Sequence, residues 1–404
     1  MARPTPNRWL MLGLGLAAQA AASAFLYGLP MLLPELRQEG TLTLTSAGWV
    51  VAAPTIGLLA TLILWGAAAD RRGERDVMAA GLVLAGGFLL AAASVHGVVA
   101  RFGLLLLAGA SGGSVNAAGG RLVMGWFAAH ERGMAMGVRQ TSQPLGVAIA
   151  ALTFPPVAAR YGVGWALVVP AVLCLGIALL VISLVVDPVR PSTEAGRSTR
   201  SPYRTPTLWR LHASSALLVI PQFAVSAFAL EYLVSERHWS ASNAGRLLFG
   251  FQLAGAAGRI AAGRWSDQTG SRLRPMRLVA VAAAVTMVAI AVGAEGHSAL
   301  AVVAIGVGTV VTVADNGLGF TAVAELAGTD WAGRAMGVQN TGQNFTASLT
   351  PPLLGALIAS AGFGWGFLVV AAFPIVAVVT TPVAAETGRS AAKVGREAEQ
   401  VLTG

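Results

Sequence analysis

The chain has 404 residues, of which 55% are hydrophobic and only 11% are charged, and its mean hydropathy is +0.68. So few polar side chains cannot solvate a globular protein of this size, and the composition therefore excludes an ordinary soluble domain and predicts a membrane protein. The net charge is +9, but no basic stretch forms the patch of a folded soluble domain, and we expect no nucleic-acid partner.

Twelve apolar segments of the chain are long enough to cross a bilayer, since a hydrocarbon core of about 30 Å needs roughly 20 residues of helix. Backbone groups in hydrocarbon must be bonded internally, and the segments are much longer than the roughly 10-residue strands of a membrane barrel. The sequence therefore predicts an all-α membrane protein with twelve transmembrane helices. In chain order, the segments cover about residues 9–34, 46–69, 76–96, 98–126, 133–158, 163–186, 210–234, 242–264, 276–295, 298–325, 333–360 and 363–385.

The first segment is interpreted as helix 1 and not as a cleaved signal peptide. Its apolar run, which starts at Trp9, is longer than a signal core, and no small-residue cleavage site followed by a polar chain is found. Within it, Gln19, Ser23 and Tyr27 follow one another at intervals of four residues and share one face of the helix. We expect this face to look into a central cavity and to bind substrate.

A glycine-rich charged loop follows the second segment and recurs after the eighth. The two copies consist of Gly66, Asp70, Arg71, Gly73 and Arg75, and of Gly263, Asp267, Gln268, Gly270 and Arg272. The aspartates are 267 − 70 = 197 positions apart, close to half of the 404-residue chain. The protein is therefore predicted to be a duplicated unit.

Basic residues gather at alternate ends of the segments, for example in the first loop copy and in the stretch between the two halves. By the positive-inside rule, those ends face the cytoplasm. We predict a multi-pass protein of the cytoplasmic membrane with both termini inside the cell.

A polar stretch rich in Pro, Ser, Thr and Arg separates the halves and is typical of a linker. The predicted organisation is an N-terminal six-helix bundle at residues 1–187, a cytoplasmic linker at 188–207, a C-terminal six-helix bundle at 208–386 and a cytoplasmic tail at 387–404. The single cysteine, Cys174, has no partner for a disulfide. We expect no metal and no cofactor.

With six plus six segments, a basic central loop and the duplicated glycine–aspartate–arginine–glycine loop, the whole chain resembles the major facilitator superfamily. The resemblance implies two pseudo-symmetric bundles that rock about a central site, each a pair of inverted three-helix repeats. It also implies that Asp70 contacts the start of helix 11 near Gly333, and that Asp267 contacts the start of helix 5 near Gly133. These contacts would latch the bundles together on the cytoplasmic side, and the two loop copies are assigned to this latch. A simple positive-inside turn is the alternative.

Three charged residues lie well inside predicted helices, and near the middle of a span an ionised group costs about 2.5–3.5 kcal/mol on the insertion scale and needs a partner or a function. They are Arg139 in helix 5, Arg259 in helix 8 and Asp315 in helix 10. In our hypothesis, the two arginines bind a small organic anion and Asp315 is a counter-charge or a proton-coupling site. A structural ion pair between Asp315 and one arginine is the alternative. By the resemblance, anion-transporting branches of the superfamily place a substrate-binding arginine at the position of Arg259.

Amide side chains occur at matched depths in the two halves. Gln143 and Gln343, in helices 5 and 11, are 343 − 143 = 200 positions apart, and Asn116 and Asn316 repeat the offset in helices 4 and 10. Gln222 in helix 7 repeats part of the helix 1 face. We assign Gln143, Gln222, Asn316 and Gln343 to substrate binding. The alternative is that the amides join helices by hydrogen bonds worth about 1 kcal/mol each.

These features predict a secondary transporter that moves a small polar solute, an organic anion in our hypothesis, by alternating access with proton symport or antiport. A multidrug or metabolite efflux antiporter is the first alternative, although the stretch around Thr153 lacks the glycine–proline signature of proton-coupled drug exporters. A transporter-like membrane sensor is the second. We expect no enzyme, because no histidine–carboxylate cluster occurs.

Two further predictions concern assembly and one peripheral charge. We expect a monomer whose partners are the solute, the lipid bilayer and protons. Glu231, near the outer end of helix 7, is interpreted as a side chain that snorkels to the membrane surface.

Overall fold

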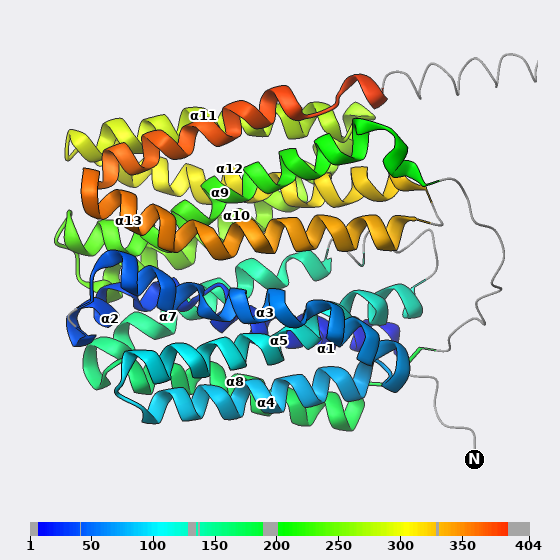
Figure 1. Ribbon diagram of the computed structural model, residues 1–404, viewed down its shortest axis with the longest axis horizontal. Coiled ribbons are helices and arrows are strands. Elements are labelled where there is room, and N and C mark those ends of the chain that lie inside the picture. Colours follow the sequence, from blue (N-terminus) through cyan, green and yellow to red (C-terminus); the bar gives the residue numbers. More distant parts are fainter. Residues whose placement is uncertain are drawn as a thin grey trace, which may run out of the picture.

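A computed structural model of the chain consists of long α-helices that run roughly parallel to one another (Figure 1). It describes residues 7–40, 42–127, 135, 138–188, 201–328 and 331–386, without the side chains of Asp70 and Met124. The elements of the first half are α1 (Arg8–Leu26), η1 (Leu29–Leu32), α2 (Leu33–Gly40), α3 (Leu44–Arg72), α4 (Glu74–Ser94), α5 (Val98–Trp126), α7 (Ser142–Tyr161) and α8 (Val163–Leu184). Those of the second half are η2 (Pro202–Arg204), α9 (Pro206–Ser235), α10 (Ala241–Thr269), α11 (Leu273–Glu295), α12 (Ala299–Ala327) and α13 (Ala332–Thr380).

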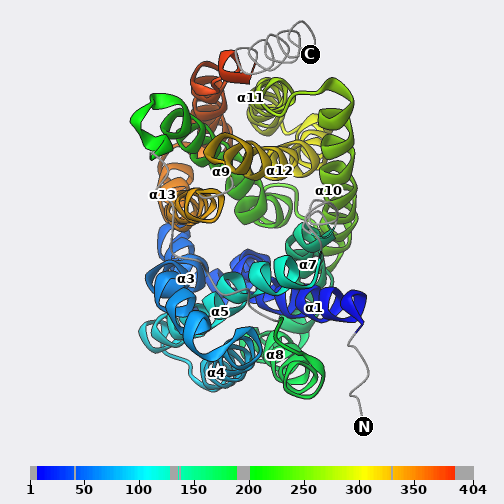
Figure 2. The ribbon, with the colours of Figure 1, turned by 90° about the vertical axis from the view of Figure 1, so that its right-hand side faces the viewer.

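The helices form two groups that lie side by side (Figure 2). Helices α1 to α8 make up the N-terminal bundle, and α9 to α13 make up the C-terminal bundle. The bundles meet where α3 packs on α13 and where α7 packs on α10. The predicted all-α fold of two six-helix bundles is confirmed.

Ten of the described helices are long and apolar enough to cross a membrane. One of them is α13, which contains predicted helices 11 and 12 joined at Gly362. Helix α10, with 29 residues, is also long enough, but its charged side chains make it less apolar. With α13 taken as two helices and with α10 included, the predicted number of twelve is reached.

Glycines with positive φ make the sharp turns between helices. Gly73, the central glycine of the first loop copy, has φ +94° and joins α3 directly to α4. Gly162 and Gly362 have φ +88° and +85° at matching positions in the two halves. Side chains rarely adopt this backbone region, so glycine suits these turns.

Helix 1 differs from its prediction as one continuous span. The α-helix ends at Leu26, and the chain continues through η1, which contains Pro30, into the short helix α2. Pro30 lacks a backbone N–H, so a regular α-helix cannot pass through this point without losing a hydrogen bond. The break separates α1, which is long enough to span, from α2, which carries charged residues beyond it.

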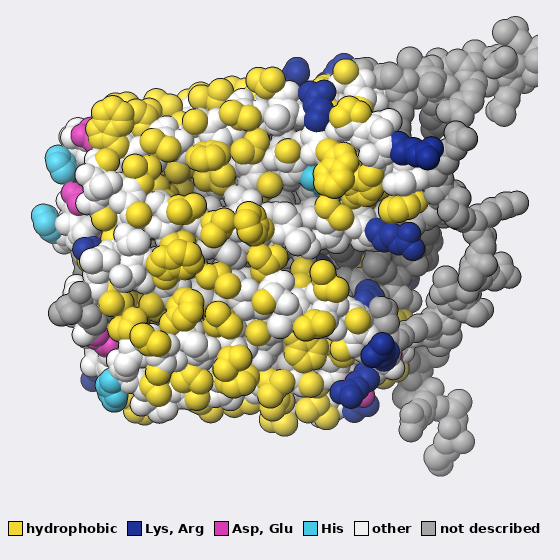
Figure 3. All heavy atoms as spheres, viewed as in Figure 1, with side chains coloured by type: hydrophobic (Ala, Val, Ile, Leu, Met, Phe, Trp, Pro, Cys, Tyr) yellow, Lys and Arg dark blue, Asp and Glu magenta, His cyan; other side chains and the backbone are white. Residues whose placement is uncertain are grey.

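The two ends of the molecule differ in charge. We call the end where α1 begins, α8 ends and α9 begins the terminal face, and the opposite end the distal face. In Figure 3, Arg side chains gather at the terminal face, while the sides between the ends are mostly hydrophobic. The apolar sides fit the hydrocarbon of a bilayer.

The bundles approach each other closely toward the distal face. A Cβ atom on Gly48 of α3 would lie 2.8 Å from the Pro351 carbonyl oxygen of α13, and one on Gly355 would lie 2.9 Å from the Leu44 carbonyl oxygen. Toward the terminal face, by contrast, a Cβ atom on Gly263 or Gly333 would meet no described atom within 4 Å. Among the described residues, the tightest packing between the bundles is therefore near the distal face.

Candidate functional site

A small cavity lies between the two bundles, with a volume of about 30 Å³. Its walls include four residues that the sequence assigned to substrate binding: Tyr27, Gln143, Gln222 and Arg259. This volume is about the share of one water molecule in the liquid. The bundles would therefore have to part before an organic solute could occupy it.

In the N-terminal bundle, Gln19 and Asn116 join α1 to α5. Gln19 Nε2 donates to Asn116 Oδ1 at 2.9 Å. Arg139, which lies just before α7, donates from Nη2 to Gln19 Oε1 at 3.2 Å. Ser23 is fully buried and packs where Gly146 of α7 approaches α1. Of Gln19, Ser23 and Tyr27, only Tyr27 lines the cavity.

The C-terminal bundle repeats this arrangement in α9 and α12. Asn316 Nδ2 donates to Gln222 Oε1 at 2.9 Å, so the same two residue types pair as in the first half, but here the asparagine is the donor. Gln343 Nε2 of α13 donates to Asn316 Oδ1 at 3.2 Å, whereas Arg139 donates to the glutamine of the first pair. The duplicated amide pair thus has a cation beside it in one bundle and a neutral amide in the other.

Arg259 reaches from the C-terminal bundle to the N-terminal bundle. Its Nη1 donates to the Gln140 carbonyl oxygen at 3.0 Å, and its Nη2 donates to Gln143 Oε1 at 3.3 Å. Its Nε is buried and has no hydrogen-bond partner, and the same holds for Nε of Arg139. Both guanidinium groups therefore contact neutral oxygens and retain unused donors.

Asp315 is buried in α12, with 2% of its surface exposed. It interacts electrostatically with Arg259. Across the described residues, however, no ion pair joins Asp315 to Arg139 or to Arg259. The ion pair between Asp315 and one of the arginines, which was the structural alternative, is therefore not formed in this conformation.

Tyr27 also contacts both bundles. Its hydroxyl donates to Asn344 Oδ1 of α13 at 3.2 Å. Its ring packs edge-on against Phe223 of α9, with ring centres 5.8 Å apart. Tyr27 follows the last residue of α1, so the helix break presents this side chain to the second half.

A second polar cluster in the C-terminal bundle was missed from the sequence. Gln339 Oε1 lies 2.7 Å from His212 Nδ1, and Gln339 Nε2 donates to Ser215 Oγ at 2.6 Å. The Tyr203 hydroxyl, in η2, lies 3.0 Å from His212 Nε2. The 200-residue offset between Arg139 and Gln339 was visible, but the histidine partner lies on another helix, and spacing along one helix cannot show it.

Glu231 corrects a prediction. Its side chain is 1% exposed and forms an ion pair with Arg37 of α2, so it does not snorkel to the surface. The prediction was wrong because helix 1 breaks, and the break brings α2 of one bundle over the distal end of α9 in the other. The pair thus links the bundles near the distal face.

The loop motifs are held at the terminal face mainly within each bundle. Asp187 Oδ1 accepts a hydrogen bond from the Arg75 backbone N–H at 2.8 Å, at the start of α4. In the other half, Glu386 Oε1 accepts from Arg272 N at 2.8 Å, at the start of α11. Neither acid stands in a motif that marks it as a partner of the loops, although 386 − 187 = 199 fits the repeat.

The predicted contacts between bundles at these loops are only partly described. Asp267 pairs with Arg272 of its own loop, and Arg272 Nε lies 3.3 Å from Glu325 Oε1. The Asp70 side chain and Gly133 lie outside the described residues. The latch between the bundles therefore stays a prediction.

No group of three or more His, Cys, Asp or Glu side chains that could hold a metal ion occurs in the part of the chain that the structure describes. The central site is instead built from amides, hydroxyls and two guanidinium groups. Such groups bind a solute by hydrogen bonds and charge.

Comparisons with known proteins agree with this architecture. A model of the Major Facilitator Superfamily matches residues 14–351, and matches again at residues 225–402. An uncharacterized MFS-type transporter of Mycobacterium tuberculosis strain ATCC 25618 / H37Rv is 44% identical over 382 residues, covering 93% of this chain and 85% of the relative.

Solved structures with low sequence identity share the fold. A bacterial homologue of the human lysosomal transporter Spinster, in an inward-facing and occupied conformation, has a TM-score of 0.77 and 13% identity, with 95% of this chain and 98% of that chain covered. A point mutant of the nucleoside transporter NupG has a TM-score of 0.72 and 16% identity, with 93% of this chain and 99% of that chain covered.

Proposed function

Because this chain belongs to the Major Facilitator Superfamily of membrane transporters, we propose that it carries a small organic anion across the membrane by alternating access. The observation that supports an anion is the pair Arg139 and Arg259. One comes from each bundle, both contact neutral oxygens, and neither pairs with a described carboxylate. A carboxylate of the solute would supply the charge-assisted hydrogen bonds that these groups lack.

A relative movement of the two bundles would change the site, because Arg259 of the C-terminal bundle is hydrogen-bonded to the N-terminal bundle. Its contacts with Gln140 and Gln143 of the N-terminal bundle exist only while α10 lies against α7. An anion between Arg139 and Arg259 replaces these neutral acceptors. Binding energy from the solute is thereby linked to the relative position of the two bundles.

A gate at the distal face fits the same cycle. The half-buried Arg37–Glu231 pair and the close approach of Gly48 to α13 hold the bundles together there. We assign the terminal face to the cytoplasm by the positive-inside rule, since Arg side chains gather on it (Figure 3). The described conformation is then closed to the outside.

Asp315 is the group proposed for proton coupling. It is a buried carboxylate near Arg259 without a close ion pair. Protonation would remove a negative charge that competes with the solute for the arginine. This step gives proton symport a physical basis, whereas uniport or solute exchange follows if transport does not depend on Asp315.

Flux measurements in liposomes test the proposal. Purified protein should take up a labelled mono- or dicarboxylate, and Arg259→Gln and Arg139→Gln should each lower the uptake at least about tenfold, since charged hydrogen bonds are worth about 1.5–3 kcal/mol each. Arg246→Gln is the matched control, because Arg246 is exposed on the same helix as Arg259. Normal carboxylate uptake by both site variants would refute the anion site.

The flux assay also separates the alternatives. Uptake or extrusion of lipophilic cations without carboxylate flux would favour an efflux antiporter. Specific binding of a solute without any flux would favour a membrane sensor.

A further inference from the structure

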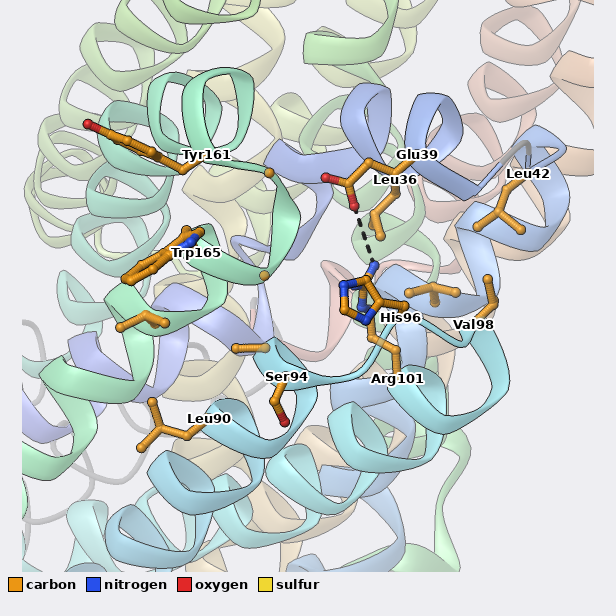
Figure 4. A pocket seen from close by; sticks show the side chains of 15 residues that line it. Leu36, Glu39, Leu42, Leu90, Ser94, His96, Val98, Arg101, Tyr161 and Trp165 are labelled. Carbon is orange, nitrogen blue, oxygen red and sulfur yellow. Dashed lines mark ion pairs between the residues drawn. The ribbon is translucent and has the colours of Figure 1, made fainter.

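A larger cavity lies away from the central site, at the distal end of the N-terminal bundle (Figure 4). Its volume is about 650 Å³, within the roughly 300–1,000 Å³ typical of small-molecule sites. The ends of α2, α4, α5, α7 and α8 surround it. No residue of the proposed transport site lines it.

The cavity contains a buried cation that is weakly held. Arg101, in the first turn of α5, is 7% exposed and lies near His96 in the cavity wall (Figure 4). Its Nη2 donates to the Val95 carbonyl oxygen at 2.9 Å, and its Nη1 lies 3.7 Å from Glu39 Oε2. Its Nε is buried and without a partner. An anion could therefore bind this guanidinium more closely than Glu39 does.

The start of helix α8 adds to the positive potential. Glu39 Oε1 accepts a hydrogen bond of 2.7 Å from the Val163 backbone N–H, at the first residue of this 22-residue helix. Helix N-termini attract anions through their free N–H groups and the helix dipole. One carboxylate, Glu39, thus serves two positive partners, and its side chain is 40% exposed.

One side of the rim of the cavity is apolar and exposed. Leu90 of α4 is 40% exposed, Tyr161 of α7 is 58% exposed, and Trp165 of α8 is 62% exposed. Tyr and Trp side chains are typical of the level of lipid head groups, where one end of the ring is apolar and the other is wet. The cavity therefore opens where a lipid can enter it from the bilayer.

We propose that this cavity binds a membrane phospholipid, with its phosphate at Arg101 and His96 and the upper part of an acyl chain between Leu90 and Trp165. The positive groups match the phosphate, and the apolar rim matches the chain. Glu39 lies where the amine of a zwitterionic head group would find a partner.

Occupancy of this site acts on the distal gate through α2. This helix places Leu36 and Glu39 in the cavity wall and Arg37 in the ion pair with Glu231. A lipid in the cavity supports one side of α2 while the ion pair holds the other. The bound lipid thereby stabilises the closed distal face.

Native mass spectrometry of the purified full-length protein in detergent tests the proposal. The protein is titrated with dioleoylphosphatidylglycerol, dioleoylphosphatidylethanolamine and glycerol 3-phosphate. We expect retention of at least one of the two lipids and not of the free glycerol phosphate. Arg101→Gln should weaken the retained lipid at least tenfold, while Arg246→Gln, an exposed arginine near the distal end of α10, should leave it unchanged.

A second variant protects the test against misfolding of Arg101→Gln. Val98→Trp should project a bulky ring into the cavity and obstruct the lipid while Arg101 stays in place. Equal lipid retention by this variant and the native chain would overturn the proposal, whatever the fold of Arg101→Gln. Retention of glycerol 3-phosphate as tight as that of the lipids would likewise overturn a lipid as the occupant.

Discussion

Closure of the distal face should depend on the ion pair between Arg37 and Glu231, and removal of this one contact tests how strongly. Glu231→Gln keeps the size of the side chain but removes its charge from a site that is 1% exposed. Breaking a fully buried pair costs about 3–5 kcal/mol. The Arg37 side chain is 37% exposed and can rehydrate, so we expect about 1–3 kcal/mol, which is roughly a 5- to 150-fold change in an equilibrium.

The direction of the change follows from where the pair exists. It joins the two bundles only while the distal face is closed, so its loss destabilises that state relative to a state open to the outside. More frequent opening should expose the central cavity from the distal side. Ser226→Cys places a thiol in the cavity wall, and the native Cys174 is buried and gives little background.

The assay is the rate at which a membrane-impermeant maleimide added outside labels this thiol. Glu231→Gln should raise the rate by the roughly 5- to 150-fold factor given above. The exchanged variant Arg37→Glu with Glu231→Arg should bring the rate back toward that of the parent. Equal labelling rates with and without Glu231→Gln would refute the reasoning.

Three further predictions concern proton coupling, pH and the loop turn. Asp315→Asn should abolish the dependence of uptake on a pH gradient while solute exchange continues, and a persistent gradient effect would assign coupling elsewhere. Burial raises the pKa of Glu35, in α2 beyond the first span, from 4.5 to about 7; the folded state therefore holds a proton that the unfolded state releases, so thermal stability should fall as pH rises from about 4.5 to 7, and Glu35→Gln should flatten this slope in a melting series. Gly73→Ala forces a side chain into φ +94°, which should reduce the free energy of unfolding by about 1–2 kcal/mol and lower the melting temperature. Gly87→Ala is the control, because Gly87 lies inside α4 with open space around it, and this variant should keep or raise the melting temperature.

The twelve spans could be predicted because each apolar run is a property of a contiguous segment. The amide residues that form the pairs Gln19–Asn116 and Gln222–Asn316 could be identified one by one, since the 200-residue repeat and helical spacing made them visible. The partners of these and other buried side chains could not be predicted in the same way, because such contacts depend on how helices far apart in sequence lie against each other. Arg37 with Glu231 is the clearest example, and it rests on a helix break whose sign in the sequence was Pro30.

The contacts of the charged loops at the terminal face could not be predicted for the same reason. The repeated loops were recognised from their glycines and aspartates, yet the acids that bond to the starts of α4 and α11 are Asp187 and Glu386, more than 100 residues away in each half. Neither stands in a motif of its own. Only the packing of the last helix of each bundle beside the loop reveals the contact.

The contact of Glu386 also sets a boundary for shortening the chain. Its carboxylate accepts hydrogen bonds from the backbone of Arg272 and Leu273 and from the Ser271 hydroxyl, so it fastens the end of the second half onto the start of α11. Residues 387–404 follow this fastening in the sequence. C-terminal truncations that keep Glu386 should therefore fold, whereas truncations that also remove Glu386 should lower the yield of folded protein. Glu386 is then the practical end point for crystallisation or fusion to a reporter.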